Sequence, residues 1–264
     1  MTARRYALVT GASSGIGAAM ARLLAGEGFE VGLVARRADR LESLALELRG
    51  AGGVADVFVA DLSQPMAAEA VADQVAAAGR GVDVLVNNAG VTVTKGFAGA
   101  ALAEQHGFLE LTIATPVALT HRLLPHMLAQ GWGRIINISS IAALSSGARG
   151  NTLYPAGKSF LLKFSQSLNA ETKAHGVFVT AVLPGFVATE FQEANGIPMD
   201  RGARSFAQTA EQVACEAWAR NQKGHELVVP GIPPKLAAWL MRALPEPWMR
   251  SLTRRAAEKY YVGE

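Results

Sequence analysis

The sequence predicts an α/β protein with a doubly wound parallel sheet, and two features of the chain indicate this fold class. Short segments that are apolar throughout alternate with longer segments in which apolar residues recur at helical spacing. Uninterrupted apolar runs are typical of strands that helices cover on both faces, and strand–helix–strand units place such strands in parallel. We predict about seven strands, at residues 6–10, 30–35, 54–60, 82–86, 134–138, 177–183 and 226–229.

Helices are predicted between these strands. They span residues 16–25, 39–48, 101–129, 154–174 and 209–220, and one more helix follows residue 64. Asp39 can cap the second helix, and Ser63 or Gln64 can cap the helix after the third strand, with Pro65 in its first turn. Pro116 predicts a kink in the long helix, because a proline removes one hydrogen bond of the helix.

The composition predicts one domain with an extension. Of the 264 residues, 50% are hydrophobic and 18% are charged, which excludes a disordered chain. No linker rich in proline or serine interrupts residues 1–230, which we predict to form a single domain, and residues 231–264 are predicted to form a helical extension packed on it. Cys215 is the only cysteine, so the chain cannot form an internal disulfide.

The charges and apolar runs also bear on location and partners. A net charge of +3 with scattered Lys and Arg does not suggest a nucleic-acid partner. The five histidines show no metal-ligand spacing, so no metal site is expected. Neither a signal peptide nor an apolar run of about 18 residues is found, and we expect a cytoplasmic protein.

A glycine-rich turn after the first strand predicts a site for nucleotide phosphates. The turn contains Gly11, Ser13, Ser14, Gly15, Ile16 and Gly17 and leads directly into the first helix. Glycines let the backbone approach a pyrophosphate closely, and the start of a helix supplies N–H donors and a partial positive charge. The spacing G-x-x-x-G-x-G differs from the general dinucleotide fingerprint, so the position between strand and helix carries the prediction.

The end of the second strand indicates which nucleotide binds. Dinucleotide sites for NAD carry a carboxylate there, which bonds the ribose 2′-hydroxyl. This strand instead ends in Ala35-Arg36-Arg37, with no carboxylate before Asp39. A guanidinium suits a 2′-phosphate because it offers two donors in a fixed fork. We therefore predict NADP(H) rather than NAD(H), held by Arg36, with a lesser role for Arg37.

Several motifs, in this order, resemble the short-chain dehydrogenase/reductase family. They are residues 10–17, Asp61-Leu62, Asn87-Asn88-Ala89-Gly90, Ile138-Ser139-Ser140, Tyr154-x-x-x-Lys158 and Pro184-Gly185, and the resemblance covers about residues 5–230. It implies a Rossmann-type fold and a single-domain, NADP(H)-dependent enzyme that interconverts a ketone or aldehyde and an alcohol by hydride transfer.

The resemblance also implies which further residues hold the cofactor. It assigns the adenine end to Asp61 and Leu62, the adenosine ribose to Asn88, Ala89 and Gly90, and the nicotinamide pocket to Pro184, Gly185, Val187 and Thr189. The side chain of Asn87 is expected to tie neighbouring strands together, so its role is partly structural.

Tyr154 and Lys158 are four residues apart and therefore share one face of a predicted helix. A phenol has a pKa of ~10, and a nearby ammonium favours its charged form. Tyr154 can then act as general acid or base, while Lys158 lowers the tyrosine pKa and holds the ribose hydroxyls. Ser140 would orient the substrate oxygen.

Two positions depart from the family pattern. Ser140 lies one position farther from Tyr154 than the pattern has it; the loop over 145–150 can absorb the extra residue, and Ser139 is the alternative serine. Thr112 stands where the family has an asparagine that anchors a proton-relay water, which places the fourth catalytic position in question.

The end of the chain governs the substrate and the partners. Residues 189–206 form an apolar segment after the sixth strand, which predicts a mobile lid and a hydrophobic substrate. In the extension, one helix carries Leu236, Trp239, Leu240 and Leu244 on a stripe, and a second helix carries Trp248, Leu252 and Tyr260 on one side. We expect these helices to cover the substrate cleft or a dimer interface, with contact to a membrane surface as the alternative.

Three functions fit these residues. The first is an NADP(H)-dependent oxidoreductase, a homodimer or homotetramer, that acts on a small hydrophobic carbonyl compound or alcohol. The second is a 3-oxoacyl reductase whose substrate is carried by an acyl carrier protein or coenzyme A. The third is an NADP-sensing binding protein with weak or no catalysis. The presence of Tyr154 and Lys158 favours an enzyme, and Thr112 alone favours the sensor.

Overall fold

The computed structural model describes residues 4–93, 96–147, 152–190 and 207–260 of the chain. Seven strands form one sheet in the order β3-β2-β1-β4-β5-β6-β7, and every neighbouring pair is parallel. The strands are β1 (Tyr6–Thr10), β2 (Glu30–Ala35), β3 (Ala55–Val59), β4 (Val82–Asn87), β5 (Gly133–Ile138), β6 (Val177–Val182) and β7 (Leu227–Val228). The predicted doubly wound parallel sheet is confirmed, and its strand order reverses between β1 and β4.

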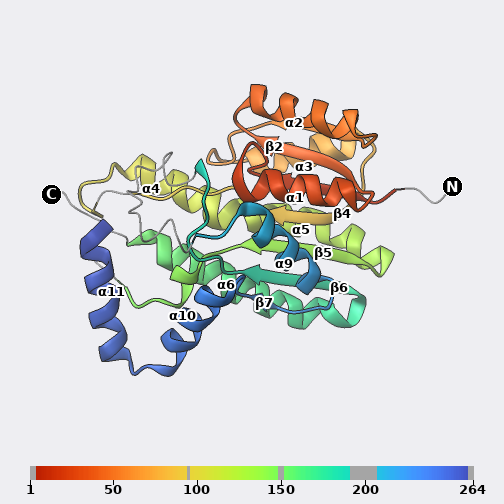
Figure 1. Cartoon of the computed structure of the whole chain (residues 1–264). Helices are drawn as coiled ribbons and strands as arrows, with labels where there is room; N and C mark the ends of the chain where they lie inside the picture. The colour runs from red at the N-terminus through yellow and green to blue at the C-terminus, as the bar shows by residue number, and fades with distance from the viewer. Residues whose placement is uncertain (1–3, 94–95, 148–151, 191–206, 261–264) are drawn as a thin grey trace.

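Helices cover both faces of this sheet (Figure 1). They are α1 (Gly15–Gly26), α2 (Ala38–Gly50), α3 (Ala67–Ala77), α4 (Leu102–Leu109), α5 (Thr115–Gln130), α6 (Leu153–Thr172), α9 (Ala210–Asn221), α10 (Ile232–Ala243) and α11 (Glu246–Tyr260). One apolar core lies between the sheet and α1, α2 and α9, and a second lies between the sheet and α3 and α5. Because both faces are buried, apolar residues dominate the strands, with polar exceptions such as Asp56, Asp83 and Arg134.

The long helix predicted over 101–129 is interrupted, so this prediction is wrong in detail. A π-helical turn, η1 (Glu110–Ala114), separates α4 from α5, and Pro116 lies in the first turn of α5. Pro116 has no N–H to donate to the carbonyl of Thr112, and its ring would crowd that carbonyl in a regular helix. The wider π-turn accommodates the proline, which places the irregularity before Pro116 and at Thr112.

Two predicted helix starts are also wrong. Arg37 occupies the cap position of α2, and Asp39 lies in its first turn. The helix α3 begins only at Ala67, after Met66 with a left-handed φ of 63°, so Pro65 is outside the helix. The carboxylate of Asp61 accepts hydrogen bonds from the backbone and hydroxyl of Ser63. That local turn delays the helix by a few residues.

The helices α10 and α11 lie at the end of the molecule toward which the strands point (Figure 1). The sequence predicts an apolar stripe at Leu236, Trp239, Leu240 and Leu244 that covers the substrate cleft or a dimer interface, and the structure divides this stripe. Leu236 and Trp239 are 59% and 64% exposed, whereas Pro234 and Ala238 are buried. Small residues pack here because the neighbouring backbone is close: a Cβ on Gly185 would lie 2.8 Å from Pro234.

Trp248 in the first turn of α11 is 66% exposed, and the predicted contacts of Leu252 and Tyr260 lie outside the described side chains. Within the ranges given above, no helix is both long and apolar enough to cross a bilayer.

Candidate active site

A cavity of about 920 Å³ opens at the carboxyl ends of the strands, beside the point where the strand order reverses. Almost all of the predicted site residues line it. They are Gly11, Ser13, Ser14, Gly15, Ile16, Arg36, Asp61, Leu62, Asn88, Ala89, Gly90, Ser140, Tyr154, Lys158, Pro184, Gly185, Val187 and Thr189. Two predicted residues do not line the cavity, Gly17 and Thr112.

The glycine-rich turn has the geometry of a phosphate cradle. Gly11 and Gly15 have positive φ angles of 64° and 55°, which favour glycine. A Cβ on Gly17 would lie 2.3 Å from the Gly11 carbonyl oxygen, so Gly17 serves the close packing of the turn rather than a ligand. The first turn of α1 holds no acidic residue, and the Ser14 side chain does not cap it. The N–H groups at this helix start are therefore suited to an anion.

Polar side chains hold the strand ends beside this turn. The Asn88 amide donates to the carbonyl oxygens of Thr10 (3.0 Å) and Gly11 (3.2 Å). The Asn87 amide donates to the Asn137 side chain at 2.8 Å and thereby joins β4 to β5. The expected strand-tying role of Asn87 matches this geometry, and the network fixes the backbone of Asn88 and Ala89 against the cavity.

Asp61 and Arg36 line the end of the cavity that is predicted to hold the adenine. Burial alone would raise the pKa of Asp61, but hydrogen bonds from Ser63 and Gln64 and the charge of Arg36 outweigh it and leave the pKa below its usual value. Asp61 therefore stays ionised and keeps its hydrogen bonds to Ser63. It also lines the cavity, and its contact with the adenine stays a prediction.

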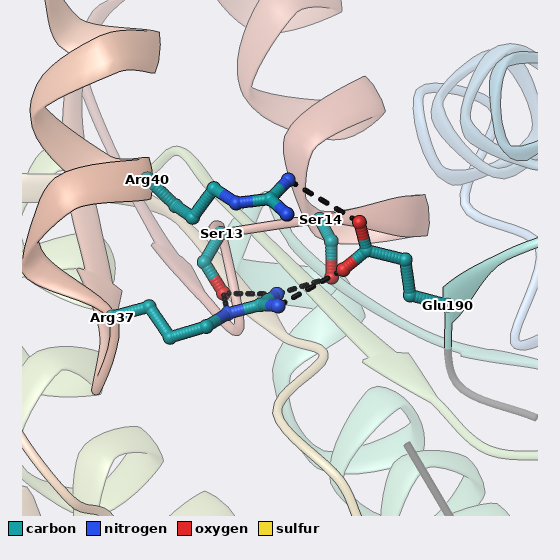
Figure 2. A network of polar contacts seen from close by, with 5 residues as sticks. All are labelled: Ser13, Ser14, Arg37, Arg40 and Glu190. Atoms are coloured by element: carbon teal, nitrogen blue, oxygen red, sulfur yellow. Dashed lines mark hydrogen bonds and ion pairs between the residues drawn. The ribbon is translucent and has the colours of Figure 1, made fainter. Parts of the chain in front are cut away.

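Arg37, for which the sequence predicts a lesser role than Arg36, makes several polar contacts beside the glycine-rich turn (Figure 2). Its guanidinium donates to the hydroxyls of Ser13 (3.0 Å) and Ser14 (2.8 Å) and to the Glu190 carboxylate at 2.9 Å. Arg40 binds the second oxygen of Glu190 at 3.2 Å. The hydrogen bond from Arg37 and the charge of Arg40 hold the pKa of Glu190 below its usual value. The sequence offers no signal for Glu190, which lies more than 150 residues from Arg37.

Ser140 and Tyr154 are brought together at the other end of the cavity. Burial raises the pKa of Tyr154, and a hydrogen bond with the Ser140 side chain opposes that rise. The Lys158 ammonium lies 5.7 Å from the tyrosine ring centroid and donates to the Ile138 carbonyl at 2.9 Å. Its effect on the tyrosine pKa stays a prediction. Burial also lowers the pKa of Lys158 to about 8.

The two candidate serines have different surroundings. The Ser139 hydroxyl is buried and donates to the Lys158 carbonyl at 2.7 Å, which joins β5 to α6. The Ser140 hydroxyl faces Tyr154 instead and accepts a hydrogen bond from the Ala142 backbone at 3.2 Å. The geometry thus favours Ser140 for the substrate oxygen. Of the loop expected to absorb the extra residue, positions 148–150 lie outside the described residues.

Thr112 is buried in η1 and packs on α6. A Cβ on Gly157 would lie 2.9 Å from the Thr112 methyl group, directly before Lys158 in the chain. The Thr112 hydroxyl has no hydrogen-bond partner in the part of the chain that the structure describes. It therefore lies close to Lys158 in the chain's packing without lining the cavity, and the proton-relay role stays a prediction.

The apolar end of the cavity is built largely by the C-terminal extension. Its lining there comes from Ala237, Leu240, Met241, Leu244, Met249 and Thr253. The sequence predicts the apolar wall at residues 189–206, of which 191–206 lie outside the described residues. The contribution of Met241 and Met249 was missed, because helix periodicity does not tell which face of an added helix turns inward.

The chain belongs to the short-chain dehydrogenase family, whose model matches residues 5–198. It is 40% identical to nodulation protein G of Rhizobium sp. (strain N33) over 69% of this chain and 73% of that protein. A solved structure from work on the stereoselectivity of 7β-hydroxysteroid dehydrogenase is similar with a TM-score of 0.86 and 26% identity, over 94% of this chain and 96% of the other. A short-chain dehydrogenase from Sphingobium yanoikuyae in complex with NADPH has a TM-score of 0.79 and 29% identity, over 92% and 97%. The family match ends before α9, α10 and α11.

Proposed function

We propose that this protein is an NADP(H)-dependent oxidoreductase that interconverts an apolar ketone or aldehyde and the corresponding alcohol. The observation that carries the proposal is that Ser140, Tyr154 and Lys158 line the same cavity as the glycine-rich turn. The NADPH complex of the similar Sphingobium enzyme supports the choice of nucleotide.

The residues present fit NADP(H). The uncapped start of α1 and the open backbone at Gly11 and Gly15 suit its pyrophosphate, and no carboxylate stands at the end of β2 to repel a 2′-phosphate. Arg36 on the cavity wall is the residue we assign to that phosphate. When bound, NADP(H) supplies or accepts the hydride.

The side chains of the site supply and accept the proton in the proposed reaction. In reduction, Tyr154 gives the proton of its Oη to the carbonyl oxygen, and that oxygen becomes the alcohol hydroxyl. Ser140 holds the same oxygen by a hydrogen bond, which fixes it in line with Tyr154. Lys158 places an ammonium near the phenol and the ribose hydroxyls, where a positive charge favours the phenolate that remains. In oxidation the same groups act in reverse.

The substrate end of the cavity supports an apolar compound. Its walls include Phe186, Leu240, Met241, Leu244 and Met249, and polar side chains gather at the Ser140 end. An apolar wall stabilises a bound hydrocarbon surface by about 25 cal/mol per Å² removed from water. A polar sugar would leave its hydroxyl groups without partners along this wall.

The test is NADPH oxidation over a panel of carbonyl compounds: small aldehydes, bulky aromatic or polycyclic ketones, and 3-oxoacyl thioesters. We expect turnover of bulky apolar ketones and loss of at least about 100-fold in kcat for Tyr154→Phe, with NADPH affinity nearly unchanged. Turnover confined to the thioesters would assign the protein to 3-oxoacyl reduction. NADPH binding without turnover of any compound would indicate a sensor.

A further inference from the structure

The helix α10 has an apolar face that the rest of the described structure leaves uncovered. Ile232, Leu236 and Trp239 recur at the spacing of one helix face and are 80%, 59% and 64% exposed. Trp248 follows just after the turn into α11 and is 66% exposed. Single exposed apolar residues are ordinary, but a row of large ones on one helix marks a surface that contacts something else.

The net positive charge of the chain lies in the same extension. Residues 231–264 contain six Lys and Arg and three Asp and Glu, a formal net charge of +3 that equals the net charge of the whole chain. The first 230 residues are therefore neutral overall. Lys235 and Arg242 are seven positions apart and run along one edge of the exposed apolar row. Lys235 is paired with Glu216, whereas Arg242 is exposed and has no ion pair with the described residues.

We propose that α10 docks the protein on the surface of a bilayer that carries anionic headgroups. A helix with Trp and Leu on one face and basic residues at its edge lies in the interface plane, where the apolar face enters the acyl boundary and the basic side chains meet the headgroups. Trp239 and Trp248 suit this position because an indole pairs an apolar ring with one polar N–H.

A second copy of the chain is the competing occupant of this face. In a two-fold symmetric pair the same patch meets itself, so the exposed Arg242 of each copy would lie in one interface, between two extensions that each carry a formal net charge of +3. Anionic headgroups instead complement that charge. The charge distribution thus favours the bilayer.

The placement of α10 connects this surface with the cavity. Ala237, Met241 and Leu244 line the cavity from the inner side of the helix, and Leu240 both lines it and is 41% exposed. A compound dissolved in the bilayer would thus lie one helix away from the apolar end of the cavity. This link to substrate supply rests on the proposed function, whereas docking itself does not.

The experiment is co-sedimentation of the full chain with vesicles of phosphatidylcholine alone or mixed with phosphatidylglycerol. We expect the protein to bind the anionic vesicles, and Trp239→Gln or Leu236→Gln to weaken this binding at least about fivefold. Arg242→Gln should weaken the binding less, and raised salt should abolish the difference between Arg242→Gln and the unaltered protein. Leu46→Gln and Lys173→Gln are matched controls, because Leu46 is 66% exposed on α2 and Lys173 is exposed beyond α6. Both controls should bind like the unaltered protein.

Two results would overturn the proposal. One is failure of the unaltered protein to sediment with anionic vesicles. The other is sedimentation that is equal for Trp239→Gln, Leu236→Gln and the two controls. Light scattering tests the competing occupant. If the protein does not bind vesicles and forms a dimer that dissociates with Trp239→Gln, this face is the contact with a second copy. Thermal melts and NADPH binding show that each variant is folded, and vesicle binding is measured without turnover, so the outcome is independent of the proposed reaction.

Discussion

At the scale of single residues, burial gives Lys158 a measurable effect on stability. Its pKa is about 8 in the folded protein, against 10.5 for the free side chain. Below pH 8 the lysine is charged in both states, and the cost of burying the charge is fully present. As the pH rises from 8 to 10.5, the folded state gives up the proton first, so the unfolded state binds more protons and stability rises.

We therefore expect the free energy of unfolding to rise with pH relative to that of Lys158→Met, by up to about 3 kcal/mol between pH 8 and 10.5. Urea titrations from pH 7 to 10 measure this difference. Groups other than Lys158 titrate in both proteins and cancel. Lys173→Met, which removes an exposed lysine, should show no such trend. A difference that is flat or falls over this range contradicts the burial of a charged lysine.

Glu190 supplies a second prediction at this scale. Its carboxylate binds Arg37 and Arg40, and Arg37 and Glu190 both line the nucleotide cavity beside Arg36. We therefore expect Glu190 to compete with a cofactor phosphate for Arg37. Exposed ion pairs contribute little, which limits the effect. Glu190→Gln should tighten NADPH binding about two- to fivefold, as measured by calorimetry.

Glu47→Gln is the control for Glu190→Gln, because it breaks the exposed ion pair with Arg22 and is remote from the cavity lining. The affinities of both variants for adenosine 2′,5′-bisphosphate and for ADP then show which phosphate competes with Glu190. A gain for the bisphosphate alone identifies the 2′-phosphate as the group that displaces Glu190. If Glu190→Gln weakens NADPH binding instead, Glu190 supports the site rather than competing for it.

At the scale of elements, the sequence predicts what is local and misses what depends on distant partners. The strands follow from apolar runs, and Thr209 caps α9 through the reciprocal bonds with Gln212 that such a pair predicts. The start of α3 could not be predicted, because Asp61 engages Ser63 and diverts the chain. The π-turn before Pro116 was missed because the proline signal marks a disturbance but not the side of the proline on which it falls.

The same π-turn makes Thr112 informative. Its hydroxyl is buried and has no partner among the described residues, and such a group costs stability. Thr112→Val keeps the shape and removes the hydroxyl, so the free energy of unfolding should rise by about 1 kcal/mol with kcat unchanged. Thr115→Val is the matched control in the next turn. The Thr115 hydroxyl donates to the Leu62 carbonyl at 2.9 Å, so its loss should be destabilising.

The alternative for Thr112 is the proton relay. If its hydroxyl holds a relay water, Thr112→Val should lower kcat while NADPH affinity stays constant. Urea unfolding and steady-state rates on the same samples separate the two roles. A fall in kcat together with a gain in stability would show that the hydroxyl is kept for the reaction at a cost to the fold.

At the scale of the whole molecule, the site joins two parts of the chain with different predictability. The nucleotide half is built from segments that directly follow strands, so the order of motifs along the sequence places Gly11, Asn88 and Ser140 at one sheet edge. The substrate half depends on how α10 packs. The close approach of α10 to the sheet end depends on the contact between Pro234 and Gly185. The spacing of apolar residues along the sequence does not predict this contact.

We therefore expect the inner side of α10 to determine the selectivity of the enzyme for substrates of different size. Met241→Ser removes apolar contact from the cavity wall, and kcat/KM for a bulky apolar ketone should fall about five- to tenfold, since each lost CH₂ contact costs about 0.8 kcal/mol. A small aldehyde that reaches only the Ser140 end should be turned over as before, and the Kd for NADPH should not change. Leu236→Ser, on the outward side of the same helix, is the control and should leave kcat/KM for a water-soluble ketone unaltered. Equal losses for the small and the bulky substrate would mean that Met241 supports the catalytic end through the fold, and the extension would then shape the enzyme without contacting what it binds.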